Sequence, residues 1–244
     1  MEFLAEVAGW FTDPANWSGS DGIPTRLIEH LVLSGVPLLV AVAIALPLGL
    51  WVGHTGRGAA IVVNLSNIGR AVPSLAILII AFMLLSAPLV AFGLRRDVGE
   101  VATALAMIAL AIPPIVTNAY IGLQEVDREL IEAGRGMGMR ETQLLWRVEL
   151  PLAIPVVLAG VRTSAVQVVA TATLGAVVAT GGLGRYIIDG IAQRAHEEVF
   201  AGALLVTALS IATELAFALV QRRAVSPGLR TAALPSERQY SSAT

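Results

Sequence analysis

Apolar residues dominate five long stretches of the chain, at about residues 31–53, 59–86, 99–123, 152–179 and 198–221. Each stretch exceeds the ~20 residues that a helix needs to cross the hydrocarbon core of a bilayer. The stretches are continuously apolar and do not alternate with period two, which argues against a membrane β-barrel. Backbone groups in lipid must be satisfied internally, so helices are the expected state. The pattern therefore predicts an all-α integral membrane protein with about five transmembrane helices.

Composition agrees with this class and narrows the chemistry. The 244 residues are 56% hydrophobic and 14% charged, with no cysteine and three widely spaced histidines, His30, His54 and His196. We therefore expect no disulfide, no thiol nucleophile and no metal site. All sixteen basic residues are arginine, so a phosphate-binding loop of the G-x-x-x-x-G-K-[ST] kind is excluded. We expect no directly bound cofactor, and any ATP used in the process would be hydrolysed, with Mg, by another subunit.

Polar segments divide the chain into three parts. Residues 1–30 place Trp10 and Trp17 beside turn formers, which predicts an external or interfacial N-terminal segment. Residues 31–225 are the predicted transmembrane domain, interrupted by a long polar loop at 124–151. Residues 226–244 are rich in Ser, Pro and Ala and are predicted to be a disordered cytoplasmic tail.

The distribution of arginine predicts an N-out, C-in orientation. In that orientation nine arginines are cytoplasmic, namely Arg57, Arg128, Arg135, Arg140, Arg147, Arg222, Arg223, Arg230 and Arg238. Five are external, namely Arg26, Arg95, Arg96, Arg185 and Arg194. An excess of cytoplasmic Arg and Lys sets the orientation of most multi-span proteins, so loop 124–151 is expected on the cytoplasmic side.

The loop at 124–151 has the pattern of two short helices. Val126, Leu130 and Ala133 recur at helical spacing, and three glycines, Gly134, Gly136 and Gly138, are then expected to break the helix. A second helix is expected from Glu141 to Val148, with an apolar stripe formed by Leu144, Leu145 and Val148, close to Trp146. Such a pair can bind a partner protein or lie on the membrane surface, and the pattern alone leaves the two readings equal.

A resemblance favours the partner. Glu132-Ala133-Gly134, with Gly138 four residues later and Val148-Glu149-Leu150-Pro151 after nine more, resembles the EAA loop of ATP-binding-cassette (ABC) importer permeases. That family has Glu-Ala-Ala, then glycine, then Ile-x-Leu-Pro, so this chain departs at Gly134 and Val148. The resemblance implies a type I (MetI-like) permease bundle in a bacterial inner membrane. It also implies a coupling role for Glu132, Ala133, Gly134, Gly138, Val148, Leu150 and Pro151.

Further segments are similar to osmoprotectant permeases, including 71–78, 149–164 and 181–187. This narrower resemblance implies uptake of glycine betaine, carnitine, choline or proline. The implied partners are a cytoplasmic ATPase dimer, an external substrate-binding protein and a second permease copy or paralogue. No nucleic-acid partner is expected. The alternative solute is an amino acid or related small molecule.

Polar side chains inside the apolar stretches form stripes at helical spacing, and two readings stay open. They can line a translocation path or hold helices together, and the second reading is favoured for Ser, Thr and Gly. The candidate path residues are Asn64, Asn67, Ser74, Asn118, Gln167, Thr171 and Glu214. In the second stretch, Asn64, Asn67, Ala71 and Ser74 are expected on one helical face.

Glu214 is the sharpest of these residues, because a carboxylate in a membrane helix costs roughly 2.5–3.5 kcal/mol on insertion scales. We expect a structural ion pair with Arg70 or Arg162, with contact to a cationic solute as the alternative. The external loop 180–197 carries a candidate docking surface or gate formed by Gly182, Gly184, Arg185, Tyr186 and Asp189. It can equally be a plain connector with a short interfacial helix.

Rival functions find little support. An intramembrane serine hydrolase needs a base beside its nucleophile, and the histidines lie at or beyond the ends of the apolar stretches. A channel or receptor-like scaffold gives no reason for the glycine-rich loop or its Leu150-Pro151 ending.

Overall fold

The computed structural model describes residues 2–94 and 98–224, and this part of the chain is helical without strands. In chain order the elements are α1 (Glu2–Thr12), η1 (Pro14–Trp17), α2 (Ile23–Thr55), α3 (Ala59–Ala71), α4 (Ser74–Ala91), α5 (Val98–Gln124), α6 (Arg128–Gly136), α7 (Glu141–Leu144), η3 (Leu145–Glu149), α8 (Leu150–Thr171), η4 (Ala172–Val178), α9 (Gly184–Gln193) and α10 (His196–Ala224). The predicted tail 226–244 and Arg95, Arg96, Arg230 and Arg238 lie outside the described residues.

Five helical stretches are long and apolar enough to cross a membrane: Ile23–Thr55, Ser74–Ala91, Val98–Gln124, Glu141–Val178 and His196–Ala224. The prediction of an all-α protein with about five membrane helices is therefore confirmed. The first of them begins at Ile23, before the predicted residue 31, because Gly22 is extended and Pro24 occupies the first helical turn.

The second predicted stretch, 59–86, is wrong as a single helix. It is divided into α3 and α4 at Val72-Pro73, where Val72 is extended at φ −79°, ψ 127°. Pro73 contributes to the break because it lacks an N–H and disfavours helical geometry in the preceding residue. The expected common face of Asn64, Ala71 and Ser74 therefore does not continue across the break, and only α4 has the length of a membrane span.

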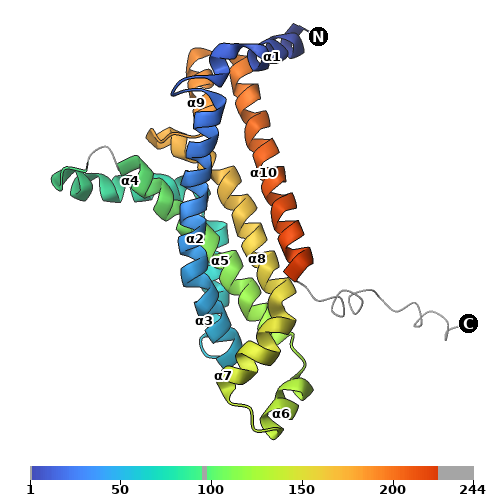
Figure 1. Ribbon diagram of the computed structural model, residues 1–244. Helices are drawn as coiled ribbons and strands as arrows, with labels where there is room; N and C mark the ends of the chain where they lie inside the picture. Colours follow the sequence, from blue (N-terminus) through green and yellow to red (C-terminus); the bar gives the residue numbers. More distant parts are fainter. Residues whose placement is uncertain (1, 95–97, 225–244) are drawn as a thin grey trace, which may run out of the picture.

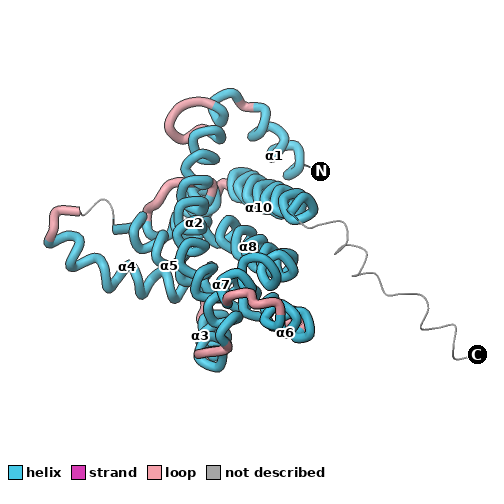
Figure 2. Tube along the Cα trace, turned by 60° about the horizontal axis from the view of Figure 1, so that its bottom comes forward, coloured by secondary structure: helices cyan, strands magenta, loops and turns pink. Residues whose placement is uncertain are grey.

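The core forms where α2 and α8 pack against α5 (Figures 1 and 2). Glycine residues, which have no side chain, let these helices approach closely. A Cβ atom on Gly49 of α2 would lie 2.7 Å from Cβ of Ala119, and one on Gly160 of α8 would lie 2.6 Å from Cβ of Asn118. Small residues at such crossings are typical of packed membrane helices, whose association depends on close van der Waals contact.

The two ends of the bundle differ, and we name them by their short helices. The α9 end contains α1, η1, the start of α2, α9 and the start of α10; the α6 end contains the end of α2, the end of α5, α6 and α7 (Figure 1). At the α9 end, α1 lies across the tops of the long helices (Figure 1). α4 leaves the bundle between the two ends and projects to one side (Figures 1 and 2). Its large side chains Ile80, Met83 and Leu84 are all more than half exposed.

Candidate functional site

The predicted coupling loop is a defined structural segment, and we call residues 127–151 the coupling segment. Its first helix, α6, begins after Asp127, whose side chain accepts a hydrogen bond from the Glu129 N–H at 2.9 Å. This is an N-cap, which satisfies one of the free donors of the first turn. Val126 therefore lies in the turn before α6 and not on its face, where it was predicted; its side chain is buried.

The glycines of the coupling segment have different roles from those expected. Gly134 and Gly136 lie inside α6, and only Gly138, at φ +80°, ends the helix. Its left-handed conformation allows the Met139 N–H to reach the Gly134 carbonyl at 3.1 Å, which closes the helix end. The prediction that all three glycines break the helix is thus wrong for Gly134 and Gly136.

Gly134 is buried against α7. A Cβ atom here would lie 3.4 Å from Sδ of Met139 and 3.6 Å from Cδ2 of Leu144, which are ordinary contact distances. The site therefore has room for the alanine that the EAA pattern carries at this position. Glu132 and Ala133 are exposed beside it.

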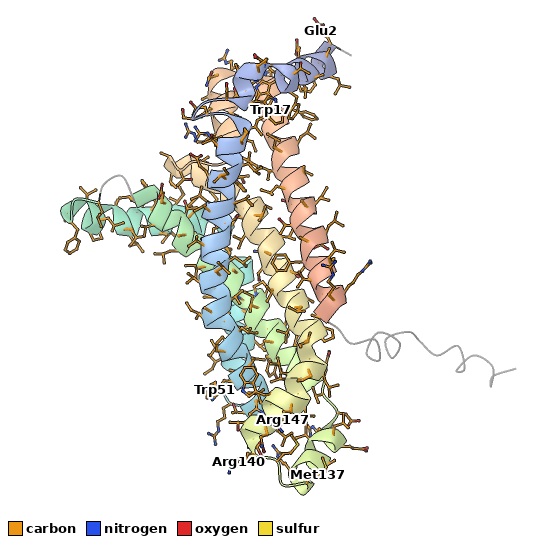
Figure 3. All side chains as sticks on the ribbon, in the orientation of Figure 1. Glu2, Trp17, Trp51, Met137, Arg140 and Arg147 are labelled. Atoms are coloured by element: carbon orange, nitrogen blue, oxygen red, sulfur yellow. The ribbon has the colours of Figure 1, made fainter. Side chains whose placement is uncertain are left out.

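The second predicted helix is present and continues directly into α8. Leu144 is fully buried, Leu145 and Val148 are half-buried, and Trp146 is 61% exposed. Met137 at the tip is 77% exposed and Leu130 is 48% exposed (Figure 3). Within the described residues, the coupling segment thus leaves three large apolar side chains uncovered on a polar background, which is typical of a surface that binds a partner.

The junction between α7 and α8 is a turn of π-helix, η3, in which the Leu150 N–H bonds to the Leu145 carbonyl. Pro151 follows at once and has no N–H for the Arg147 carbonyl, so the regular i→i−4 pattern cannot continue through this point. π-Turns mark local widening of a helix and are frequent at functional sites. Leu150 and Pro151 therefore form the joint between the coupling segment and a membrane helix.

A charged cluster connects the coupling segment to α2. His54 lies in the last turn of α2, with Nδ1 2.6 Å from Oε2 of Glu149 and Nε2 3.4 Å from Oε2 of Glu141. Arg135 binds Glu141 through Nε and Nη2 at 3.0 and 3.1 Å. The Glu141 carboxylate raises the pKa of the Arg135 guanidinium, chiefly through the side-chain hydrogen bond.

A cavity of about 360 Å³ opens beside this cluster. It lies between the ends of α2 and α5 and the inner side of α6, and its charged lining is formed by His54, Arg128, Glu132, Arg135 and Glu149. Sequence reasoning set the histidines aside because they form no metal-ligand spacing. His54 and Glu149 are 95 residues apart, so no local pattern could have joined them.

A second cavity, of about 290 Å³, lies where α3 and α4 separate. Two predicted path residues, Ser74 and Gln167, line it together with Pro73, Leu110 and Pro113. Pro113 and Pro114 have no N–H for the carbonyls four residues earlier, at Ala109 and Leu110. The Gln167 amide, the Ser74 hydroxyl and the backbone carbonyls freed by the two prolines therefore place polar groups around a cavity among apolar helices.

The structure does not bring the other predicted path residues to this cavity. Asn64 is exposed on α3, and the side chain of Asn67 lies outside the described residues. Asn118 donates to the Pro114 carbonyl at 2.8 Å and Thr171 to the Gln167 carbonyl at 2.6 Å, both within their own helices. Ser164, on the same helix as Gln167, is buried and donates from α8 to the Ala111 carbonyl of α5 at 2.9 Å, as expected of a residue that joins helices.

Glu214 forms an ion pair with Arg162, one of its two predicted partners. Arg162 also donates to Oε1 of Gln221 at 3.2 Å, and Gln221 donates to the Pro155 carbonyl at 2.9 Å. These contacts fasten α10 to α8. The side chain of Arg70, the other predicted partner, lies outside the described residues.

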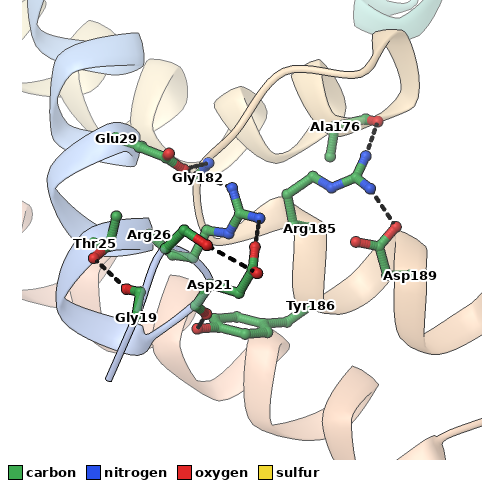
Figure 4. Close-up of polar contacts among 11 residues, drawn as sticks. Gly19, Asp21, Thr25, Arg26, Glu29, Ala176, Gly182, Arg185, Tyr186 and Asp189 are labelled. Atoms are coloured by element: carbon green, nitrogen blue, oxygen red, sulfur yellow. Dashed lines mark hydrogen bonds and ion pairs between the residues drawn. The ribbon is translucent and has the colours of Figure 1, made fainter. Parts of the chain in front are cut away.

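The predicted docking residues at the α9 end make internal contacts instead of forming a free surface (Figure 4). The Gly182 N–H donates to Oε2 of Glu29 at 2.8 Å, and the Tyr186 hydroxyl donates to the Asp21 carbonyl at 2.6 Å. Arg185 pairs with Asp189 at 2.6 Å. Gly184 is also buried, since a Cβ atom would lie 2.4 Å from the Thr173 carbonyl oxygen.

Arg26 holds the same region from α2. It pairs with both Asp21 and Glu29, and the second distance is 2.9 Å (Figure 4). Burial raises the pKa of Tyr186 to about 12, because the phenolate would lose its hydration. The loop before α9 is thus tied to the start of α2, which favours the alternative prediction of a connector with a short helix.

Known proteins are similar to this chain in sequence. The family described as binding-protein-dependent transport system inner membrane component matches residues 45–226. The glycine betaine/carnitine/choline transport system permease protein OpuCB of Bacillus subtilis is 35% identical over 202 residues, which cover 83% of this chain and 88% of that protein. The glycine betaine/proline betaine transport system permease protein ProW of Escherichia coli is 32% identical over 175 residues, covering 72% of this chain and 46% of that protein.

Among solved structures, a chain of the MetNI methionine ABC transporter in an inward-facing conformation superposes with a TM-score of 0.73. The match covers 88% of this chain and all of that chain at 22% identity. At this identity the match supports a common fold, and it agrees with the predicted type I permease bundle.

Proposed function

The chain belongs to the family of binding-protein-dependent transport system inner membrane components, and from this premise we propose that it carries a quaternary-ammonium compatible solute across the membrane. It is a multi-pass inner-membrane protein and a permease component of an ABC importer. The solute class is supported by the relatives, whose names specify glycine betaine, carnitine and choline. Proline, the fourth solute that the sequence resemblance implies, is an amino acid without a quaternary nitrogen, so it stands as the alternative to this class.

The observation that carries this function is the coupling segment. It combines three exposed apolar side chains, Leu130, Met137 and Trp146, with a π-helical joint to α8. An apolar surface on a short helix pair suits a groove in a partner protein, and the joint connects the pair directly to the membrane helix α8. We propose that a cytoplasmic ATPase dimer binds this surface and that its cycle of ATP binding and hydrolysis moves the segment.

The orientation proposed for this arrangement is N-out, C-in. It places the coupling segment, with Arg128, Arg135, Arg140 and Arg147, on the cytoplasmic side together with the end of α10. The α9 end then faces outward, where a separate binding protein would deliver the solute.

A second copy or a paralogue is proposed to complete the path. The helix α4 is apolar on all sides, yet only one face of it packs on the bundle, around the buried Leu78, and Ile80, Met83 and Leu84 stay more than half exposed. A helix that is apolar all round is normally surrounded by lipid or protein. Pairing through this region would bring the Ser74–Gln167 cavities of two chains toward a common path.

Solute selection is proposed to reside mainly in the binding protein. Quaternary ammonium groups are usually held by aromatic cages through cation–π attraction. Among the described residues, none that lines the Ser74–Gln167 cavity is aromatic. A cavity without such a cage would hold the solute weakly, which suits its passage, because a site that bound the solute tightly would slow its release.

The test is reconstitution. The chain would be co-expressed with any ATPase and binding protein found in the neighbouring reading frames, placed in proteoliposomes and assayed for ATP-driven uptake of labelled glycine betaine, carnitine, choline and proline. We expect uptake of at least one quaternary-ammonium solute, and expect Gln167→Leu to slow it more than the control Thr207→Ala on α10. Failure of any ATPase to co-purify would refute the function, and uptake of amino acids alone would refute the solute class.

A further inference from the structure

The pair formed by His54 and Glu149 is placed at the joint of the coupling segment. Glu149 is the last residue of the π-turn, and its side chain is 5% exposed. His54 is in the last turn of α2, with a side chain that is 13% exposed. Their contact of 2.6 Å therefore joins two membrane helices, α2 and α8, at the point where the coupling segment leaves the bundle.

The chemistry of the pair makes it hard to separate. A carboxylate can only accept a hydrogen bond, so this contact requires a hydrogen on Nδ1 of His54. A buried carboxylate without a partner is strongly destabilising, because it loses its hydration and gains nothing in return. The π-turn cannot swing away from α2 without exposing Glu149 to that cost or carrying it into water.

The pair also extends in both directions. On one side, Glu141 lies 3.4 Å from Nε2 of His54 and is held by Arg135 of α6. On the other side, Gln124 at the end of α5 donates to the Gly53 carbonyl of α2 at 2.7 Å. Polar contacts thus run from α6 through α7 and α2 to α5, the central helix of the bundle.

We infer that His54 and Glu149 are positioning residues that transmit the movement of the coupling segment to α2 and α5. The inference rests on the proposed function, and it adds a connection that the EAA resemblance does not supply, since Glu149 occupies the unspecified position of the Ile-x-Leu-Pro pattern. Without the contact between His54 and Glu149, the coupling segment would still bind the ATPase through Leu130, Met137 and Trp146. Its tilt would then be absorbed at the π-turn, and ATP would be hydrolysed without transport.

The experiment measures solute uptake per ATP hydrolysed in the reconstituted complex. His54→Ala and Glu149→Ala are each expected to lower this ratio about tenfold, because each removes the contact between α2 and the π-turn, and His54→Ala also leaves the buried Glu149 carboxylate unpaired. The double variant is expected to lose no more than either single variant, whereas independent roles would multiply the losses. Glu149→Gln keeps an acceptor for Nδ1 and is expected to retain most of the ratio, and His196→Ala is the histidine control at the opposite end.

Two outcomes overturn the inference: multiplied losses in the double variant, or a parallel fall of uptake and ATP hydrolysis that leaves their ratio unchanged. A wild-type complex that hydrolyses ATP without uptake would instead refute the proposed function, so the two failures are distinct. A second measurement keeps His54 and Glu149 intact, so it tests the inference even if the alanine variants do not fold. The chain has no cysteine, so Thr55→Cys with Thr142→Cys can carry a spin-label pair, whose distance should stay constant between nucleotide states. A change in that distance would show that the segment moves independently of α2.

Discussion

The α9 end and the α6 end both pair their charged residues within the chain, yet they differ in how they place large side chains. At the α9 end, Arg26, Arg185 and Tyr186 are bound to neighbours in the same chain, and the ring of Trp10 packs edge-on against Tyr186 at 5.2 Å. In the coupling segment at the α6 end, by contrast, the large apolar side chains of Met137 and Trp146 are 77% and 61% exposed. The difference teaches that similar residues can brace the chain internally at one end and leave a surface for the proposed partner at the other.

Replacing Gly138 tests the α6 end with the largest expected effect. In Gly138→Pro the ring fixes φ near −65°, against the observed +80°, and removes the N–H that bonds to the Arg135 carbonyl at 2.9 Å. ATP-driven uptake should fall to background while the protein remains in the membrane. Gly138→Asn is the control, because asparagine tolerates the left-handed region; it should keep most of the uptake. Normal uptake by the proline variant would contradict a coupling role.

Removing the exposed tryptophan tests whether this end is a binding surface. Trp146→Ala should weaken ATPase binding by about 2 kcal/mol, as expected of a central aromatic anchor in an interface, and leave the thermal stability of the isolated permease nearly unchanged. Titration of the ATPase against permease in detergent measures the first quantity and a melting curve the second. A loss of stability with unchanged binding would make Trp146 a bracing residue like those of the α9 end.

The reverse is expected for Tyr186. Tyr186→Phe removes the hydrogen bond to the Asp21 carbonyl and should lower stability by about 1 kcal/mol without affecting ATPase binding. Because the pKa of Tyr186 is raised to about 12, the folded state favours the protonated phenol. Its contribution to stability is therefore fully present below the usual tyrosine pKa of about 10 and is lost as pH rises toward 12. Melting curves across this range should show a decline that is smaller in the phenylalanine variant.

The smallest effect is expected at Gly134. Gly134→Ala should stabilise α6 by at most about 1 kcal/mol, because alanine is the better helix former and the site has room for Cβ. Uptake should stay close to wild type. A clear loss of uptake would mean that Gly134 serves a conformational change of α6, and a drop in melting temperature would mean that the contact with Met139 and Leu144 cannot adjust.

The sequence predicts those features that depend on residues close together in the chain, and it fails where distant residues make contact. The membrane spans and the coupling segment follow from local patterns, and both were predicted. The break at Val72-Pro73 was missed because proline alone does not decide it: Pro37, Pro47, Pro113 and Pro114 remain inside helices. Neighbouring helices determine whether a proline is accommodated or ends a membrane helix.

Long-range partners were beyond sequence reasoning for the same reason. The charge of Glu214 indicated an ion pair, but the choice of Arg162 comes from the packing of α10 on α8. Glu149 was inside the recognised motif, yet its partner His54 is on another helix. The three glycines of the coupling segment were all predicted to break the helix, but only Gly138, which has a positive φ, ends α6.

The close crossings at Gly49 and Gly160 limit how this molecule can change shape. Neither crossing has room for a methyl group, so we expect α2, α5 and α8 to move as a single block. Alternation between inward and outward access would then require rotation of whole subunits against each other, with the axis at their mutual boundary.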